Sequence, residues 1–410
     1  MKSSAVDSSH DHRTPRARIL VLTTSYPSED GDPTGVFIAH LLGAIKRRGY
    51  VIKVVAPSDG TFHGRRELDG IETVRFGYFR PRSLERLTRP GGGIPENMAR
   101  SLLARVQVLP MMAMFVWVCL SEIRGSDIIY ANWLGAGIIG AIANFFTRKP
   151  LVVSFRGDDG YLARERFLWR ILTKWVARRS SIVAPVSGDL LHILLDLGVP
   201  EGKCRLPRFG VDTQLFYPPA EPRKAGEEVK LLFVGSLIGR KGIRDLLLTL
   251  AHPSLEMVHL TVVGDGMDKP ELLEMSRRSD MEERIEWRGF LPPAEVARLM
   301  RISDALCLPS YMEGRPNVVN EAMASGLPVV AARVGGIPDM VIEGETAFLF
   351  TPGNVTELLG CLVTLVSDPR LRIRMGRAGH EFLVRSGVSW DTTAEEFDVL
   401  FSGLVTDTRK

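Results

Sequence analysis

The sequence is poor in cysteine and contains no paired cysteine motif. Its 410 residues include four cysteines, Cys119, Cys204, Cys307 and Cys361, which lie far apart and form no C-x-x-C. This spacing argues against a disulfide framework or a zinc ribbon and fits a reducing compartment, so we expect a cytoplasmic protein. Residues 1–17 contain no apolar segment, and we therefore expect a disordered tail there rather than a signal peptide.

Neither a long hydrophobic run nor a large excess of one charge is present. Lys and Arg number 52 and Asp and Glu 48, and the net charge of +4 is spread along the chain, so nucleic acid is not an expected partner. The most apolar stretch, residues 109–120, is too short to cross a bilayer and is interpreted as a buried helix. Basic residues before it suit anionic headgroups, which leaves peripheral membrane association open beside the simpler interpretation of a solvated loop. These residues are Arg80, Arg82, Arg86, Arg89, Arg100 and Arg105.

Three ligand-binding motifs are also missing. The dinucleotide signature G-x-G-x-x-G does not follow the first predicted strand, and Gly264-Asp-Gly266 lacks the third glycine, so a nicotinamide dehydrogenase is disfavoured. No Walker sequence is present, so ATP hydrolysis is not indicated. Asp158 and Asp159 are adjacent and lack the spacing of an Asp-x-Asp metal motif, and we expect neither a divalent ion nor another cofactor.

The chain does contain a repeated alternation of short apolar strands with helices. Its length suits two domains. Alternating strands and helices indicate parallel sheets covered on both faces. The expected fold class is therefore α/β, with two Rossmann-like, doubly wound domains that face each other across a cleft. Strands are predicted at residues 18–22, 51–56, 127–130, 151–155 and 181–186, and then at 230–234, 259–263, 284–287, 305–308 and 329–331.

A polar, Pro-rich stretch near the middle of the chain sets the domain boundaries. Residues 216–228 are interpreted as a linker between an N-terminal domain, 18–215, and a C-terminal domain, 229–385. Residues 386–410 are expected to form a C-terminal helix that packs back towards the first domain.

The segment between residues 310 and 336 carries the most chemical information. Glu313 and Glu321 stand eight positions apart around a Gly-Arg-Pro turn. Pro316 favours the first position of a helix, which we predict to run over residues 317–324 and to end at Gly326. Free amides at the start of such a helix form an anion site, and the two carboxylates would hold hydroxyl groups on either side of a phosphate. The simpler alternative is a pair of solvated helix charges.

A second turn, from Gly235 to Gly242, brings two cations to the end of another strand. Its sequence, Gly-Ser-Leu-Ile-Gly-Arg-Lys-Gly, combines flexible glycines with Arg240 and Lys241 in front of an apolar helix. This is a plausible cradle for a diphosphate, although a basic surface turn is an equal alternative on this segment alone. Together with the acidic pair, it favours a sugar nucleotide as ligand.

At this point the chain resembles the glycosyltransferase group 1 family, the retaining enzymes of the GT-B fold (family 4). The segment from Glu313 to Glu321 is similar to that family's E-x7-E motif, and the resemblance covers nearly the whole chain. Further segments that look familial are Tyr26-Pro with Gly35-Val-Phe, Asn132-Trp-Leu-Gly-Ala-Gly, Ser154-Phe-Arg-Gly-Asp, Gly210-Val-Asp, Val263-Gly-Asp-Gly and Gly335-Gly-Ile-Pro.

The resemblance implies a catalytic role for four residues. Glu313 should contact the transferred sugar, Lys241 should neutralise the diphosphate, and Arg156 should bond a sugar hydroxyl or the departing phosphate. The family's phosphate-binding arginine falls on Ser236 here, and Arg240 is the candidate to replace it.

The remaining positions are implied to bind the donor. Glu321 should hold the ribose hydroxyls, Gly35 should lie near the donor phosphates and the acceptor, and backbone amides from Gly314 to Val318 should meet sugar hydroxyls and the distal phosphate. The donor-binding residues are Glu321, Gly35, Gly235, Ser236, Gly314, Arg315, Pro316, Asn317 and Val318.

The function implied is transfer of a hexose, with retention and without a metal, from a UDP- or GDP-sugar to a glycan or a lipid-linked acceptor, as in polysaccharide biosynthesis. The first domain would bind the acceptor through loops in residues 57–100, and the second domain would bind the nucleotide sugar. The alternatives are a nucleotide-sugar epimerase or phosphorylase of the same fold, or a non-catalytic subunit that binds a sugar nucleotide. The cytoplasmic face of a membrane is one expected location.

Overall fold

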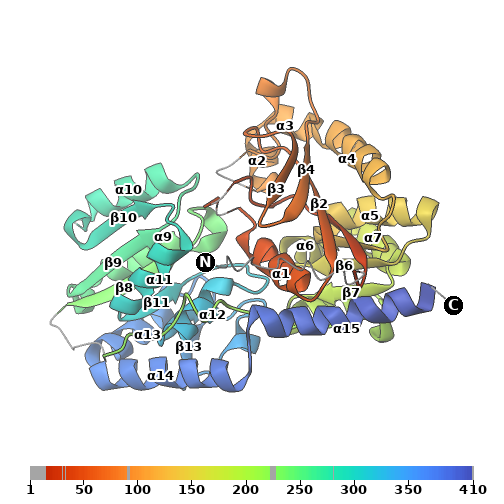
Figure 1. Ribbon diagram of the computed structural model, residues 1–410. Helices are drawn as coiled ribbons and strands as arrows, with labels where there is room; N and C mark the ends of the chain where they lie inside the picture. The colour runs from red at the N-terminus through yellow and green to blue at the C-terminus, as the bar shows by residue number, and fades with distance from the viewer. Residues whose placement is uncertain are drawn as a thin grey trace, which may run out of the picture.

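The computed structural model describes residues 15–408 except 30, 33, 90–92, 222–227 and 280, and leaves out the side chains of 158, 159, 407 and 408. The predicted tail up to residue 14, part of the predicted linker and the carboxylates of Asp158 and Asp159 therefore lie outside the described residues. The chain forms two α/β lobes, each built on one sheet (Figure 1).

The first lobe is built on a seven-stranded sheet in the order β3-β4-β2-β1-β5-β6-β7, in which only β3 runs antiparallel to its neighbour. Its strands are β1 (Arg18–Leu22), β2 (Val51–Pro57), β3 (Gly64–Leu68), β4 (Ile71–Phe76), β5 (Ile128–Asn132), β6 (Leu151–Phe155) and β7 (Ile182–Pro185). Its helices are α1 (Val36–Arg47), α2 (Ile94–Arg100), α3 (Leu102–Val106), α4 (Val108–Glu122), α5 (Trp133–Thr147), α6 (Asp158–Glu165), α7 (Phe167–Arg179) and α8 (Gly188–Asp196).

The second lobe is built on a six-stranded parallel sheet in the order β10-β9-β8-β11-β12-β13. Its strands are β8 (Val229–Val234), β9 (Val258–Val263), β10 (Ile285–Gly289), β11 (Ala305–Leu308), β12 (Val329–Ala332) and β13 (Ala347–Phe350). The helices that follow β8 are α9 (Ile243–Leu250), α10 (Lys269–Arg278), α11 (Pro293–Ile302), α12 (Asn317–Ala324), α13 (Val355–Ser367), α14 (Pro369–Arg385) and α15 (Trp390–Thr408).

Strand β1 shows why the first sheet is apolar on both faces. Successive side chains of a strand point to opposite sides. Leu20 and Leu22 accordingly enter the core formed with α4 and α5, whereas Ile19 and Val21 enter the core formed with α1, α8 and α15. A central strand covered on both sides reads as a continuous hydrophobic run, which is what the sequence shows.

The predicted α/β fold with two parallel sheets is confirmed, and all ten predicted strands are present within two residues of their expected limits. Strands β3, β4 and β13 were not predicted. β3 is mostly exposed and polar, so it carries no hydrophobic signal, and its partner β4 lies in the region interpreted as acceptor loops. β13 is as short as β11 and β12, which were predicted, so its length does not explain why it was missed.

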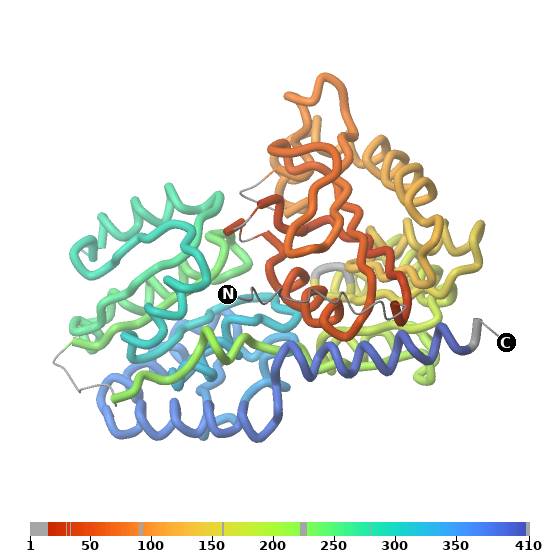
Figure 2. Tube along the Cα trace, viewed as in Figure 1, coloured from red at the N-terminus to blue at the C-terminus, as the bar shows by residue number. Residues whose placement is uncertain are grey.

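Helix α15 returns from the second lobe and lies along the first. Figure 2 follows the trace from α14 in the second lobe to the C-terminus beside the first lobe. Phe397 and Phe401 of α15 are fully buried against Tyr130 of β5, with ring centroids 5.3 and 5.8 Å from the tyrosine ring. Arg47 at the end of α1 donates to Asp391 at 2.8 Å. The core of the first lobe therefore includes the last helix of the chain.

The apolar helix α4 is buried on one side only. Phe115 and Cys119 are fully buried in the core of the first lobe, but Leu109 and Trp117 are exposed. The interpretation as a buried helix is therefore correct for one face. Within the described residues, one stretch, Leu102–Glu122, meets the length and composition of a membrane-crossing helix, and 33% of its most apolar window is buried.

Candidate functional site

The turn after β8 is held close to the end of β11. Gly242 ends this turn at φ 66°, and a Cβ placed there would lie 1.9 Å from the carbonyl oxygen of Pro309, so only glycine fits without displacing the backbone. Tyr311 also donates its backbone N–H to the carbonyl of Arg240 at 2.8 Å. Because β8 and β11 are neighbours, this packing brings Lys241 to the loop that carries Glu313.

Lys241 and Glu313 form an ion pair at the carboxyl end of the second sheet. The ammonium nitrogen lies 2.6 Å from Oε1 of Glu313, and the hydroxyl of Ser310 donates to the same oxygen at 2.7 Å. Glu313 is only 6% exposed. Removal from water strengthens such a pair, and loss of one partner would leave a buried charge uncompensated.

Helix α12 begins beside this pair. The predicted limits, residues 317–324, agree with the structure, and Gly326 takes the expected left-handed conformation at φ 64°. Pro316 is the N-cap residue, with extended backbone, rather than the first helical residue as predicted. Among the described residues no acceptor is found for the N–H groups of Asn317 and Val318. These two amides and the helix dipole form a positive end that suits an anion.

Glu321 lies about 6 Å further along the axis of α12, since each residue adds ~1.5 Å. Its carboxylate makes no hydrogen bond or ion pair within the described part of the chain. The side chain keeps a narrow exposed surface but is surrounded by protein, and this burial raises the pKa of Glu321 to about 7. A carboxylate without a protein partner at such a position is suited to accept hydroxyl groups of a ligand.

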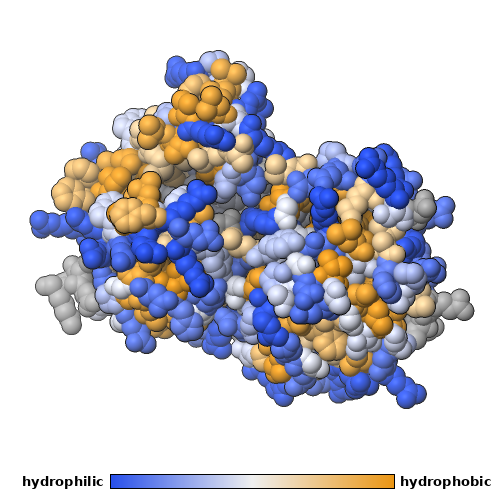
Figure 3. Space-filling view, turned by 180° about the vertical axis from the view of Figure 1, so that it is seen from behind, coloured by the Kyte–Doolittle hydropathy of each residue, from blue (hydrophilic) through white to orange (hydrophobic). Residues whose placement is uncertain are grey.

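The two lobes meet at the Glu313–Gly314 segment. A Cβ on Gly314 would lie 2.0 Å from the carbonyl oxygen of Arg156 in the first lobe, so absence of a side chain permits the contact. The hydroxyl of Tyr161 donates to the carbonyl of Glu313 at 2.9 Å. The space-filling view shows a furrow between the lobes (Figure 3). The acidic motif of the second lobe thus faces the first lobe directly.

Arg156 is held by the first lobe. Its Nε donates to Asn132 at 2.8 Å, and its guanidinium lies over the rings of Phe37 and Phe209 at 4.9 and 5.0 Å. These contacts hold the guanidinium against the first lobe, whereas the contact with Gly314 is made by the backbone carbonyl of Arg156. They come from separate segments, and sequence spacing gave no sign of them.

The other predicted cationic and glycine positions each have their own contacts. Arg240 points across to α2, where its Nε lies 3.5 Å from Glu96, and Ser236 is exposed. Gly35 caps α1 at φ 68°, where a Cβ would lie 2.6 Å from the carbonyl oxygen of Ser25. Gly235 donates its N–H to Val263 at 3.0 Å. Of the predicted cations, the structure therefore brings Lys241 to the acidic motif and turns Arg240 towards the first lobe.

The side chain of Arg315 lines a separate cavity of about 290 Å³, and the prediction for this residue concerned its backbone amide. Burial lowers the pKa of the Arg315 guanidinium. Asp339 shares the lining and accepts the backbone N–H of Gly188 in the first lobe at 2.8 Å. This contact is a second bridge between the lobes.

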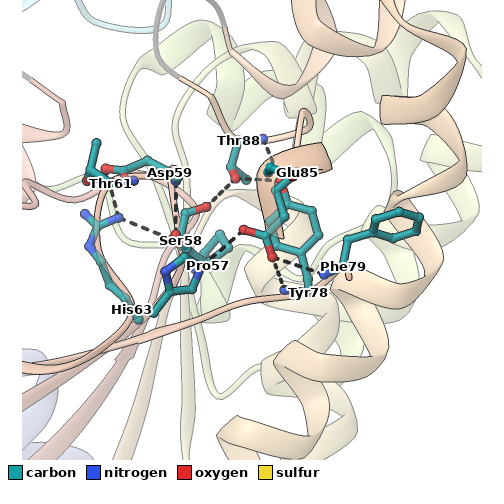
Figure 4. A network of polar contacts seen from close by, with 12 residues as sticks. Pro57, Ser58, Asp59, Thr61, His63, Tyr78, Phe79, Glu85 and Thr88 are labelled. Carbon is teal, nitrogen blue, oxygen red and sulfur yellow. Dashed lines mark hydrogen bonds and ion pairs between the residues drawn. The ribbon is translucent and has the colours of Figure 1, made fainter. Parts of the chain in front are cut away.

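A buried polar network shapes the loops of the first lobe that were expected to meet the acceptor (Figure 4). Glu85 is almost fully buried and accepts the backbone N–H groups of Tyr78 and Phe79 at 2.7 and 3.1 Å, with His63 at 3.3 Å. The hydroxyls of Tyr78 and Thr88 lie 2.9 Å apart. The network ties the segment after β4 to the end of β2, although residues 77–81 and 85–89 form no helix or strand.

We predict that Glu85→Ala destabilises the protein by about 1–3 kcal/mol, because two buried backbone N–H groups lose their acceptor. Urea unfolding would measure the change. Glu67→Ala, at an exposed position on β3, is the matched control and should alter stability by less than about 0.5 kcal/mol. Equal stability of the two variants would show that the network does not support the fold.

Three residues that contact the predicted site were missed. Ser310 and Tyr161 bond Glu313, and Glu96 faces Arg240. Ser310 could have been noted, because a hydroxyl three residues before a carboxylate often bonds locally. Tyr161 and Glu96 belong to the other lobe, so only the three-dimensional arrangement reveals them.

Comparison with solved structures identifies the fold as GT-B. Sucrose-phosphate synthase from Thermosynechococcus elongatus superposes with a TM-score of 0.79 at 20% identity, over 96% of this chain and 100% of that one. Anabaena Alr3699/HepE, solved in complex with UDP-glucose, gives a TM-score of 0.70 at 22% identity, over 94% of this chain and 100% of that one.

Sequence comparison then gives the family. The model for Glycosyl transferases group 1 matches residues 219–382, and that for a Glycosyl transferase 4-like domain matches residues 34–227. A D-inositol 3-phosphate glycosyltransferase from Corynebacterium efficiens is 39% identical over 370 residues, which cover 78% of this chain and 85% of that protein. The chain belongs to the group 1 glycosyltransferase family, as the resemblance of its motifs implied.

A glycogen synthase from Mycobacterium tuberculosis is also similar, at 28% identity over 283 residues, or 65% of this chain. The chain spans just under two thirds, 66%, of that relative's length.

Proposed function

We propose that the protein transfers a hexose, with retention of anomeric configuration and without a metal ion, from a UDP- or GDP-sugar to a glycan or lipid-linked acceptor. The donor would bind in the second lobe and the acceptor in the first. The reaction would take place in the cytoplasm or at the cytoplasmic face of a membrane, as one step of polysaccharide biosynthesis. Related folds have been solved with UDP and UDP-glucose, which supports a nucleoside diphosphate as donor group.

The observation that carries the proposal is the position of Lys241 next to Glu313 and the start of α12. A donor diphosphate placed there would meet the ammonium group and the two amides of Asn317 and Val318, which have no acceptor among the described residues. Glu321, whose carboxylate has no partner in the described part of the chain, would accept the ribose hydroxyls. The positive groups would bind the negative diphosphate, and the neighbouring carboxylate of Glu313 would bind hydroxyl groups of the sugar. This arrangement matches the charges of a sugar nucleotide.

The chemistry follows from this charge pattern. The bond between the anomeric carbon and the diphosphate oxygen breaks, and the acceptor oxygen forms its bond to the same face of that carbon. The acceptor proton passes to the departing phosphate. Negative charge grows on the leaving oxygen, and donors fixed there stabilise the transition state more than the ground state. Lys241 and the helix amides would do so.

Thermal unfolding with UDP- and GDP-sugars, followed by an assay of nucleoside diphosphate release, tests the proposal. A bound donor should stabilise the fold by about 2.7 kcal/mol at a hundredfold excess over Kd. Release that requires an acceptor and persists in EDTA would support a metal-independent transferase. Formation of a sugar 1-phosphate from a glycan and inorganic phosphate would indicate a phosphorylase, and binding of the donor without turnover would indicate a non-catalytic subunit; either result would overturn the proposal.

A further inference from the structure

The outer side of the first lobe exposes large apolar side chains on three adjacent helices. α4 packs against α5 and α5 packs against α7, so the three lie side by side. The most exposed side chains are Leu109 and Trp117 of α4, Phe145 and Phe146 of α5, and Phe167 and Leu168 of α7, at 60–79% exposure. We call these six residues the apolar face; Figure 3 shows hydrophobic side chains gathered on this lobe.

Basic residues accompany the apolar face. Helix α7 contains Arg170, Lys174, Arg178 and Arg179 and no acidic residue. The guanidinium of Arg179 lies over the ring of Phe145 at 5.2 Å, so the charge and the aromatic side chain are in direct contact. Long basic side chains can extend from an apolar surface to phosphate groups above it.

The structure of α4 limits how this face could meet a lipid bilayer. Phe115 and Cys119, on the opposite side of the same helix, are fully buried in the core of the first lobe. The helix would have to leave that core to cross a membrane. It can, however, lie parallel to the surface with Leu109 and Trp117 inserted, as amphipathic interfacial helices do.

We propose that the apolar face docks the protein flat on an anionic lipid bilayer. Charge decides between a bilayer and a second copy of the chain. Two copies joined through this face would bring the basic residues of α7 together, whereas anionic headgroups neutralise them and acyl chains cover Phe167 and Leu168. A negatively charged membrane therefore complements both the apolar side chains and the basic residues of this face.

Helices α2 and α3 connect the furrow between the lobes to α4, the first helix of the apolar face. Glu96 of α2 lies 3.5 Å from Arg240 across the furrow, and α3 begins at Leu102, which is 74% exposed. Helices α2, α3 and α4 thus lead from the edge of the site to the apolar face. On the basis of the proposed function, docking would hold the first lobe, which is proposed to bind the acceptor, against the bilayer, where a lipid-linked acceptor resides.

Vesicle flotation with the full-length protein tests the proposal. The protein should float with vesicles of phosphatidylcholine and phosphatidylglycerol and stay behind with phosphatidylcholine alone. Phe167→Glu combined with Leu168→Glu should weaken binding by more than about tenfold, because two inserted groups become anionic. Val399→Glu, at a 68% exposed position on α15, is the matched control and should bind as the unaltered protein does.

Failure to float with anionic vesicles, or equal losses in the variant and the control, would overturn the proposal. So would light scattering that shows a dimer which the double variant dissociates, because the face would then be a contact between copies. Thermal stabilisation by the donor is measured on the same samples. It shows whether the donor site is intact, so failure of membrane docking can be told apart from failure of the proposed function. A double variant that no longer floats but is still stabilised by the donor would support docking through the apolar face.

Discussion

Replacement of Lys241 by alanine is expected to lower kcat by about 10²–10³, the usual loss when one fixed donor to a developing negative charge is removed. In the proposed mechanism the ammonium group stabilises the departing diphosphate. The change also leaves Glu313, which is 6% exposed, without its ion-pair partner. We therefore expect a lower melting temperature as well, and kcat should be measured below the unfolding transition with saturating donor.

Two further variants separate chemistry from stability. Lys230→Ala removes an exposed lysine at the amino end of β8, opposite the site, and should leave kcat and the melting temperature unchanged. Lys241→Ala combined with Glu313→Gln removes both charges and should restore stability but not activity. Turnover close to the original value in Lys241→Ala would contradict the role of this residue.

Replacement of Glu321 by glutamine is expected to stabilise the free protein at high pH. The pKa of Glu321 is raised to about 7 from 4.5, so the folded protein retains a proton that the unfolded chain releases between these values. Stability of the unaltered protein therefore falls as pH rises from 4.5 to 7. At pH 8 the variant should be more stable by up to about 3 kcal/mol. At pH 4 the two should be alike.

The same variant should bind the donor less well. Above pH 7 the ionised carboxylate would accept the ribose hydroxyls, and loss of a hydrogen bond to a charged group weakens binding by about 1.5–3 kcal/mol. Donor binding to the unaltered protein should also strengthen as pH rises through about 7, with release of a proton. Calorimetry in two buffers of different ionisation enthalpy measures that proton. Equal affinity of Glu321→Gln and the unaltered protein would exclude Glu321 as the ribose acceptor.

The central strands and α12 could be predicted because their signals are local. Buried parallel strands such as β1 and β11 are continuous apolar runs, and Gly326 marks the end of α12 by a conformation that favours glycine. Strand β3 could not be predicted, because it is exposed and its pairing with β4 depends on residues outside its own hydrophobic pattern.

The sequence motifs of the site could be predicted, but the contacts between their side chains and distant segments could not. Lys241 and Glu313 are 72 residues apart, and their proximity follows from the neighbouring positions of β8 and β11, which the alternation of strands and helices does not fix by itself. The surroundings of Arg156 were not predictable, since Phe37, Asn132 and Phe209 reach it from three segments. Orientation of a long side chain depends on such distant neighbours.

The packing of α15 bears on how this chain is synthesised. Trp390, Ala394, Phe397 and Phe401 of α15 complete a hydrophobic core whose other buried members lie between residues 17 and 209. A ribosome makes α15 after the second lobe, so that surface of the first lobe stays uncovered while the second lobe is being translated. Full folding of the first lobe therefore waits until α15 has been made, and ribosome-bound chains halted before residue 390 should bind chaperones or hydrophobic dyes more strongly than the full chain.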